Sequence, residues 1–266
     1  MRGTGSAYYL YCLTSSDRDI YTFAAGVDGR HATQLRICGE TCAVYSEVDL
    51  DEFVGERAEA HLQDLAWLGP RVFRHEAAIE EIMSQAPVLP ARFATLFSTL
   101  DSLDQFILEH REGVAEFFTV LGDKQEWAVK GLLDRANALE KLSHPAAEEP
   151  ASTLGGRYLQ ERRIKAQVER EFSQRLKTFC QQVVADLGAH AGGFRERKVV
   201  GSVAEGKEPE VVLNWAFLIP QAAIEAFKAS LNRFNDDDAF PGLVLTLSGP
   251  WPPYSFVPDL SSGADA

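Results

Sequence analysis

The glycines and the lysine of one short stretch have the spacing of a loop that binds nucleotide phosphates. The stretch is GSVAEGK at residues 201–207, and such a loop holds phosphate with backbone N–H groups and its lysine. The next residue is Glu208, where a Ser or Thr hydroxyl is needed for magnesium, and Pro209 leads into a predicted strand rather than a helix N-terminus. Glu205 and Glu208 would also repel phosphate. The stretch therefore predicts a hairpin loop and not a nucleotide site.

Two other stretches contain residue types that bind metals. Cys38 and Cys42 lie near His31, but the cysteines flank a predicted hairpin turn and no second cysteine pair completes a closed zinc site. The aspartate run at residues 236–238 lacks the other ligand positions of a calcium-binding EF-hand loop. A structural cysteine pair and a solvated loop are the favoured interpretations, so neither a metal nor another cofactor is expected.

No nucleophile is accompanied by a recognisable base. The Gly-x-Ser-x-Gly pattern of a nucleophile elbow is absent, and the histidines lie in predicted helices or loops without a catalytic signature around them. His75 and Glu76, adjacent on a predicted helix, are interpreted as surface or hydrogen-bonded structural residues. A catalytic triad that assembles only in the fold leaves no fixed spacing in the chain. The prediction that the protein is not an enzyme therefore depends on the absence of every such signature.

The overall charge limits the expected partners. The chain has 266 residues and a formal net charge of −13, whereas binding to a nucleic-acid backbone or an anionic membrane surface needs a basic face. Neither nucleic acid nor a membrane is therefore an expected partner. No run approaches the roughly 20 apolar residues that cross a bilayer, and residues 7–13 are interpreted as a first strand. A cytoplasmic protein with reduced cysteines is expected.

The first half of the chain predicts an α+β order of elements. Alternating apolar residues predict strands, and apolar residues three or four apart predict helices. The predicted strands are residues 8–13, 34–38, 42–48 and 88–93, and the predicted helices are residues 53–86, with a break at Gly69-Pro70, and residues 103–121. Three strands, a helix and a strand suggest a sandwich whose first crossover helix is missing or reduced.

The second half has the strand–helix–strand–strand–helix–strand order of a ferredoxin-like sandwich. Its predicted strands are residues 126–133, 194–200, 211–219 and 243–248, and its predicted helices are residues 134–142, 158–189 and 220–234, with a loop at residues 144–156. We therefore predict an α+β protein of two domains, each a modified ferredoxin-like sandwich of antiparallel sheet and helices. The predicted domains are residues 1–121 and 122–266, and the second ends in an arm rich in aromatic residues and proline.

The arm follows the last predicted strand. Gly249 and Pro250 are expected to end that strand, because proline has no N–H to donate to a neighbour. Pro252 and Pro253 are expected to keep the next residues extended. Three aromatic residues therefore lie on a stiff segment, namely Trp251, Tyr254 and Phe256. Two interpretations stay open: a strap that packs its aromatic side chains on the domain, and a contact site for a partner.

Arg92 is the unusual residue of the strand predicted at residues 88–93. It lies between apolar neighbours, and a buried guanidinium needs a carboxylate or carbonyl groups. The favoured interpretation is an internal ion pair that fixes the strand, and the alternative is an exposed sheet edge.

Five motifs together resemble the GvpF/GvpL family of gas vesicle proteins. The sequence PVLPARFATLF at residues 87–97 resembles the family signature VLP-x-RFGT-x-F, and LSGPWPPYSF at residues 247–256 is the most specific match. The other matches, in family order, are YYLY at residues 8–11, GRYLQERR at 156–163 and LNWAFLIP at 213–220. The possible interaction residues within the two main motifs are Pro87, Leu89, Pro90, Arg92, Phe93, Gly249, Pro250, Trp251, Pro252, Pro253, Tyr254 and Phe256.

One motif position departs from the family pattern. Ala94 stands where the family usually has glycine. Because glycine is the usual residue at a positive φ, alanine predicts that this position does not need one.

The resemblance implies a non-enzymatic accessory protein of gas vesicle formation, located in the cytoplasm and at the gas vesicle. It implies two modified ferredoxin-like α+β domains, binding to the hydrophobic shell protein GvpA and to other accessory proteins, and a role at nucleation or against aggregation of shell subunits. It supplies no catalytic, cofactor-binding or metal-binding residue, and its motifs do not separate GvpF from GvpL. The competing class is a small-molecule-binding or enzymatic ferredoxin-like module.

Overall fold

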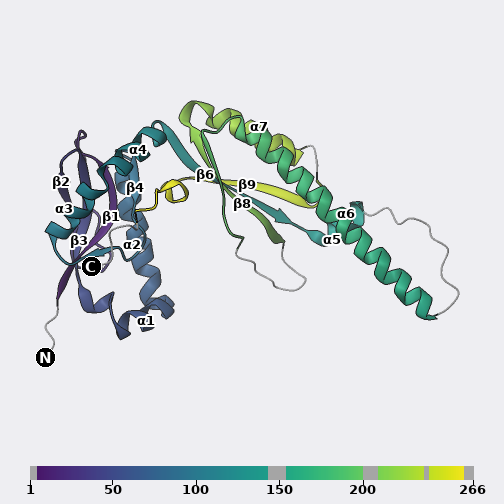
Figure 1. Cartoon of the computed structure of the whole chain (residues 1–266), viewed down its shortest axis with the longest axis horizontal. Coiled ribbons are helices and arrows are strands. Elements are labelled where there is room, and N and C mark those ends of the chain that lie inside the picture. The colour runs from purple at the N-terminus through teal and green to yellow at the C-terminus, as the bar shows by residue number, and fades with distance from the viewer. Residues whose placement is uncertain (1–4, 143–153, 200–208, 237–239, 261–266) are drawn as a thin grey trace. The chain divides into compact units, whose positions relative to one another are not determined.

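The chain divides into two compact units in the computed structural model, which describes residues 5–142, 154–199, 209–236 and 240–260 (Figure 1). The first unit combines Met1–Asp123 with Trp251–Ala266, and the second is Lys124–Pro250. We expected the aromatic arm in the second domain. It groups instead with the first unit, because its side chains pack on the core of that unit.

The sheet of the first unit is built around β1 (Ser6–Ser15). The spatial order is β2-β3-β1-β4, and β5 also pairs with β1. These strands are β2 (Gln34–Cys38), β3 (Thr41–Asp49), β4 (Val88–Pro90) and β5 (Leu96–Phe97). All of them pair in the antiparallel sense. β2 and β3 form the predicted hairpin, with Gly39 at a φ of 61° in its turn.

Helices cover this sheet through their apolar faces. α2 (Leu65–Met83) buries Ile79 and its helical neighbours against a core that includes Tyr9 and Tyr11 of β1. The buried positions of α2 are three or four residues apart, as expected for one face of a helix. The other helices of the unit are η1 (Leu50–Glu52), α1 (Glu56–Gln63), α3 (Leu100–Glu109) and α4 (Arg111–Leu121).

The helix predicted at residues 53–86 is broken at Asp64 and not at Gly69-Pro70. The Asp64 carboxylate accepts the N–H of Ala66 at 2.9 Å and so caps the start of α2. Pro70 lies inside α2, just past its first turn. The capping side chain therefore decides where the helix begins, and the proline does not.

Two further predictions of element bounds were wrong. The helix predicted at residues 103–121 is two helices that meet at His110, and α3 begins earlier, at a capping box of Thr99 and Ser102. The strand predicted at residues 88–93 ends at Pro90, and the chain turns before it reaches β5.

The second unit has a four-stranded sheet in the order β7-β8-β6-β9. β6 pairs antiparallel with β8, which pairs antiparallel with β7. The strands are β6 (Lys124–Leu133), β7 (Gly193–Glu196), β8 (Glu210–Pro220) and β9 (Leu243–Trp251). The helices are α5 (Arg135–Leu142), α6 (Leu154–Gly188), η2 (Gln221–Ala223) and α7 (Ile224–Asp236).

The last strand runs further than the sequence predicts. β9 continues through Gly249 and Pro250, which are joined by a cis peptide bond, and ends at Trp251. β9 is an edge strand with a single neighbour, so the missing N–H of proline is tolerated there.

The core of the second unit lies between the sheet and its long helices. Phe172, Phe179 and Val183 of α6 meet Phe217 of β8 and Phe227 of α7 in one apolar cluster. The Phe217 ring lies 5.1 Å from the Phe227 ring, centre to centre, and both side chains are fully buried. Their aromatic contacts fix how α7 lies on the sheet.

Replacing a central core ring should cost far more stability than replacing an exposed one. We expect Phe217→Ala to lower the free energy of unfolding by about 3–5 kcal/mol, because it leaves a cavity in the packed core. Phe73→Ala is the matched control, since that ring is 75% exposed, and it should change stability by less than about 0.5 kcal/mol. Urea unfolding followed by circular dichroism measures both, and equal effects would contradict this description of the core.

Candidate functional site

The last part of the chain that the structure describes, residues 251–260, lies on the first unit and is referred to here as the strap. Pro252 and Pro253 are buried, and the 3-10 turn η3 (Tyr254–Phe256) follows them. The Tyr254 N–H donates to the Pro252 carbonyl at 2.7 Å. Of the strap's aromatic side chains, Trp251 is exposed, whereas Tyr254 and Phe256 are half-buried.

Tyr254 ties the strap to α2. Its hydroxyl lies 2.9 Å from Oε1 of Glu76 and 3.1 Å from Nε2 of His75. His75 is buried on the inner face of α2, only 1% exposed. Tyr254 of η3 thus forms a hydrogen bond with a core residue that precedes it by 179 positions.

The motif around Arg92 reaches the same histidine from the other side. Nδ1 of His75 lies 3.0 Å from the Tyr9 hydroxyl, and the Ala94 N–H donates to that hydroxyl at 3.0 Å. The Phe93 ring lies against the rings of both Tyr9 and His75. The two main sequence motifs therefore meet around one buried imidazole.

The hydrogen bonds at His75 run in one direction. An ionised Glu76 can only accept, so Tyr254 donates to it and accepts from Nε2–H of His75. Nδ1 then carries no proton and accepts from Tyr9, whose oxygen accepts the N–H of Ala94. The order is Ala94 to Tyr9 to His75 to Tyr254 to Glu76, and it requires the neutral Nε2–H tautomer of His75.

Burial shifts every titratable group in this chain of hydrogen bonds. It lowers the pKa of His75 to about 4 and raises the pKa of Glu76 above its usual range. It also raises the pKa of Tyr9 and of Tyr254, so both phenols stay protonated. The loss of hydration penalises the charged form of each group, and the site is built for a neutral imidazole.

The other residues of the PVLPARF motif support this arrangement. The Pro87 carbonyl accepts the Thr14 hydroxyl at 2.8 Å, and Leu89 and Pro90 are buried in β4 opposite β1. Arg92 was predicted to form an internal ion pair, and this was wrong. Its side chain is exposed and has no carboxylate partner among the described residues, because the chain turns outward after Pro90.

Ala94 corrects a second prediction. The sequence indicated that this position does not need a positive φ, but Ala94 has a φ of 64°. Its N–H must point at the Tyr9 hydroxyl, and the left-handed conformation places it there. In the GPWPPYSF motif, Gly249 also has a positive φ, of 137°. A side chain is disfavoured there, because an added Cβ would lie 3.1 Å from the Glu126 carbonyl oxygen.

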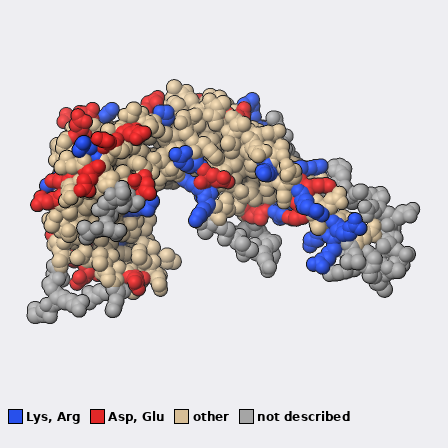
Figure 2. Space-filling view, in the orientation of Figure 1, with Lys and Arg blue, Asp and Glu red and all other residues tan. Residues whose placement is uncertain are grey.

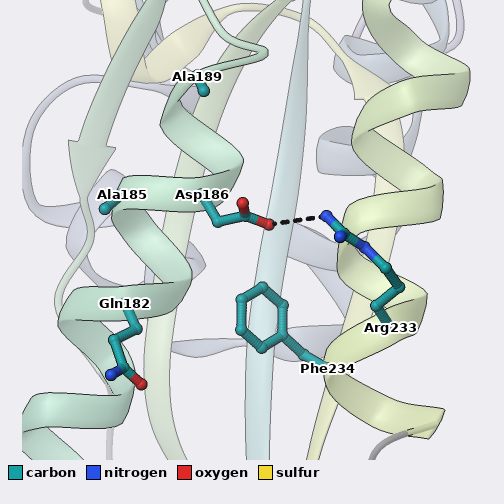
Figure 3. A pocket seen from close by; sticks show the side chains of 6 residues that line it. All are labelled: Gln182, Ala185, Asp186, Ala189, Arg233 and Phe234. Atoms are coloured by element: carbon teal, nitrogen blue, oxygen red, sulfur yellow. Dashed lines mark hydrogen bonds and ion pairs between the residues drawn. The ribbon is translucent and has the colours of Figure 1, made fainter.

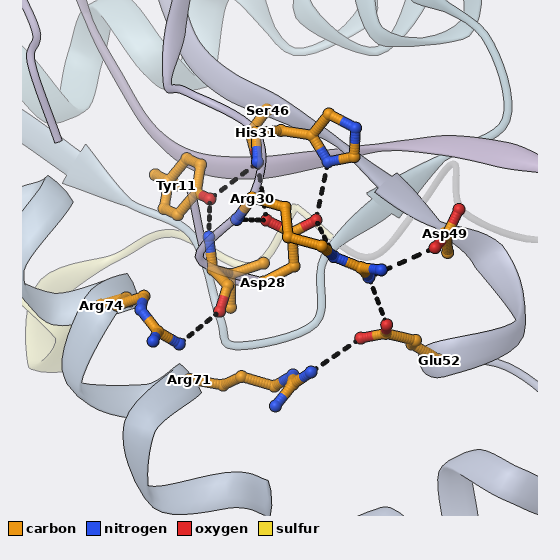
Figure 4. A network of polar contacts seen from close by, with 10 residues as sticks. Tyr11, Asp28, Arg30, His31, Ser46, Asp49, Glu52, Arg71 and Arg74 are labelled. Carbon is orange, nitrogen blue, oxygen red and sulfur yellow. Dashed lines mark hydrogen bonds and ion pairs between the residues drawn. The ribbon is translucent and has the colours of Figure 1, made fainter. Parts of the chain in front are cut away.

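The sequence did not reveal a polar network that holds the loop before β2 (Figure 4). The Asp28 carboxylate lies 2.7 Å from Nδ1 of His31, and the Val27 N–H donates to the Tyr11 hydroxyl at 2.6 Å. Glu52 accepts from Arg71 of α2 at 2.8 Å and also pairs with Arg30. The loop lies between β1 and β2, and its partners are spread over β1, η1 and α2.

An open groove of about 620 Å³ lies between α6 and α7 in the second unit (Figure 3). Its two charged side chains, Asp186 and Arg233, pair with each other. Asp186 accepts from the Ser230 hydroxyl at 2.8 Å and from Arg233 at 3.3 Å. A groove whose charged groups already neutralise each other does not favour the small-molecule or enzymatic alternative.

The sequence also contains two stretches with metal-binding residue types and one phosphate-loop-like stretch, and a structural interpretation is favoured for each. Cys38 lies opposite Thr41 in the hairpin, so Cys38 and Cys42 point to opposite faces of the sheet. No group of three His, Cys, Asp or Glu side chains that could hold a metal occurs in residues 5–142, 154–199, 209–236 and 240–260. The phosphate-loop-like stretch at residues 201–207 and the aspartates at 237 and 238 lie outside the described residues.

None of the helices in the described ranges has an apolar stretch long enough to cross a membrane.

These features define an α+β protein of two units, in which the two main sequence motifs surround a buried histidine of the first unit. The family model described as "Gas vesicle synthesis protein GvpL/GvpF" matches residues 7–258. The chain belongs to the GvpL/GvpF family, which confirms the resemblance seen in its motifs.

Individual relatives agree over nearly the whole length. Gas vesicle protein L of Streptomyces sp. (strain CB03234) is 27% identical over 256 residues, which cover 96% of this chain and 94% of the relative. Gas vesicle protein L1 of Halobacterium salinarum is 22% identical over 97% of this chain and 93% of its own.

Solved structures share the fold. The crystal structure of GvpF from Anabaena sp. PCC7120 superposes with a TM-score of 0.71 at 20% identity, and covers 96% of this chain and 97% of its own. GvpF from Microcystis aeruginosa gives a TM-score of 0.67 at 19% identity, with 95% and 99% covered. The mixed helical and antiparallel fold is therefore that of GvpF.

Acid should loosen the first unit through His75. The folded-state pKa is about 4 against an ordinary value of 6.5, so the unfolded chain takes up a proton that the folded chain resists. The contribution is complete above pH 6.5 and is lost as the pH falls towards 4, with a size of about 3 kcal/mol. Glu76, with its raised pKa, acts in the opposite direction.

Thermal unfolding between pH 7 and pH 4 tests this, with His75→Gln as the comparison. The side chains that face His75 are Tyr9, Tyr11, Phe93 and Tyr254. None of them becomes charged in this range, so the variant should lose less stability on acidification than the wild type. Parallel pH curves for the two proteins would contradict the assignment.

Glycine at position 94 should stabilise the protein. The left-handed conformation of Ala94 is strained for a residue with a Cβ, whereas glycine adopts it freely. Glycine also adds conformational entropy to the unfolded chain, which offsets part of this gain. We therefore expect Ala94→Gly to raise the free energy of unfolding by about 0.5–1 kcal/mol. Urea unfolding measures the change, and Ala91→Gly, next to the same motif, should be neutral or destabilising.

Proposed function

We propose that this protein is a non-enzymatic accessory protein of gas vesicle assembly, acting in the cytoplasm and at the vesicle. The observation that carries the proposal is the family match over residues 7–258. In this proposal the protein binds the hydrophobic shell protein GvpA and other accessory proteins. It acts at nucleation, and it keeps shell subunits from aggregating before they join a vesicle.

The proposal includes a ferredoxin-like topology for both units. The sheet order β7-β8-β6-β9 and the succession of strands and helices in the second unit support it. In the first unit the order β2-β3-β1-β4 corresponds strand by strand. The loop held by the Asp28 and Glu52 network then replaces the first crossover helix.

Most of the motif residues are better suited to the scaffold than to a contact with GvpA. Pro90, Pro252 and Pro253 are buried, and Tyr254 is engaged with His75 and Glu76. Trp251 differs from them, since 43% of its surface is exposed. We therefore restrict the proposed contact in the strap to Trp251.

The loop before β2 offers a second exposed aromatic pair. Phe23 is 83% exposed and Tyr21 is 58% exposed, with their ring centres 5.4 Å apart. The backbone that carries them is held from α2, because Glu81 accepts the N–H groups of Phe23 and Ala24. Aromatic side chains on a fixed backbone lose little entropy on binding and are common binding hot spots.

Capture of the shell protein tests the proposal and its surface together. Co-expressed, tagged wild-type protein should retain GvpA on an affinity column. Trp251→Ala and the double variant Tyr21→Ser/Phe23→Ser should each retain several-fold less, because each removes an exposed aromatic contact. Val244→Ser, exposed in the second unit, is the control and should behave as the wild type.

The possible failures are distinguishable. No retention by the wild type would contradict GvpA binding itself. Retention that is unchanged in both aromatic variants, with circular dichroism showing them folded, would leave GvpA binding in place and reject these residues as its surface.

A further inference from the structure

The first turns of α6 stand apart from the core of the second unit. Every residue from 161 to 167 is exposed, and Phe172 is the first fully buried residue of the helix whose side chain is described. In Figure 1 this part of α6 continues past the strands of its own sheet. The apolar core of the second unit therefore does not cover this part of the helix.

This part of α6 is basic in a chain that is acidic overall. Arg162, Arg163 and Lys165 are exposed and have no carboxylate partner among the described residues. Glu169, the helical neighbour expected to pair with Lys165, pairs with Arg135 of α5 instead. Figure 2 shows Lys and Arg side chains gathered over this end of the helix. We refer to residues 160–170 as the basic helix end.

Several other cations in the described part of the chain form ion pairs. Arg36 donates to both oxygens of Asp104, and Arg71 pairs with Glu52. With a formal net charge of −13, the chain has acidic groups in excess. Three neighbouring cations without a carboxylate partner among the described residues therefore form a surface whose complement is acidic.

An acidic surface lies on α3 and α4 of the first unit. Asp101, Glu109, Glu112 and Glu116 are exposed there, and Arg111 is the only basic residue of the two helices. Figure 2 shows Asp and Glu side chains gathered over this part of the first unit. We refer to it as the acidic face.

The acidic face can also receive a long side chain. A shallow groove of about 420 Å³ lies between its charged groups, lined by Asp101, Asp104, Gln105, Leu108, Glu109 and Arg111. Leu108 is half-exposed in it. The methylene stem of an arginine can pack on such an apolar side chain while its guanidinium meets the carboxylates at the rim.

We propose that the basic helix end of one copy binds the acidic face of a second copy of this chain. The two surfaces differ, so the contact is head-to-tail and leaves one basic helix end and one acidic face free at the ends of each assembly. Association can then continue beyond a dimer. Because the contact is between exposed charges, it weakens as salt shortens the screening length. This inference does not depend on GvpA binding.

Sedimentation velocity of the full-length protein at low and high salt tests the proposal. Below about 50 mM salt the average mass should rise with protein concentration, and at about 500 mM salt the protein should be monomeric. Arg162→Glu/Arg163→Glu/Lys165→Glu should weaken association by at least about tenfold, and so should Glu109→Lys/Glu112→Lys/Glu116→Lys. An equal mixture of the two triple variants should associate again, because each now carries the complement of the other.

A matched control separates this contact from net charge. Arg18→Glu/Lys177→Glu/Lys198→Glu changes the net charge by the same amount at exposed positions elsewhere, and it should associate like the wild type. Circular dichroism confirms that each variant is folded, and the salt dependence of the wild type stands even if one variant is not. A wild type that is monomeric at every salt concentration, or a mixture that does not associate, would overturn the proposal.

Discussion

A buried neutral imidazole is the constraint on which the first unit depends. His75 can accept from Tyr9 and donate to Tyr254 only as a single neutral tautomer, and its side chain is fully buried. Through these two phenols it joins β1, α2, the turn after β4 and the strap. Burying an imidazole costs free energy unless its ring nitrogens are hydrogen-bonded. Both nitrogens of His75 have such a partner.

The strap makes the first unit discontinuous in sequence. The chain leaves this unit after Asp123 and returns to it at Trp251, so the second unit is inserted between α4 and the strap. The hydrogen bonds of His75 and Glu76 are therefore complete only when the last residues of the chain are in place. This explains in physical terms why two motifs far apart in sequence are found together: each supplies one half of the same buried site.

In this protein the residues that hold the fold together differ from the aromatic residues that are exposed to solvent. Pro90, Pro252, Pro253 and Leu89 are buried and Tyr254 is hydrogen-bonded, whereas the aromatic side chains of Trp251, Tyr21 and Phe23 face outward. The charged surfaces are separate again, with cations on α6 and carboxylates on α3 and α4. In the proposed function the exposed aromatic side chains would contact a hydrophobic partner, whereas the charged surfaces would join copies of the chain.

The sequence by itself determined the family, the α+β class and most strands and helices, because apolar periodicity and rare strings such as GPWPPYSF are local properties. It placed the β2–β3 hairpin correctly, and it missed the helix start at Asp64, where a single capping bond outweighs the proline signal. Only the tertiary structure decided that Ala94 takes a positive φ, that Arg92 faces outward and that the strap belongs to the first unit. The first and the last depend on partners distant in the chain, Tyr9 for Ala94 and His75 for Tyr254, and such a partner leaves no trace in local spacing.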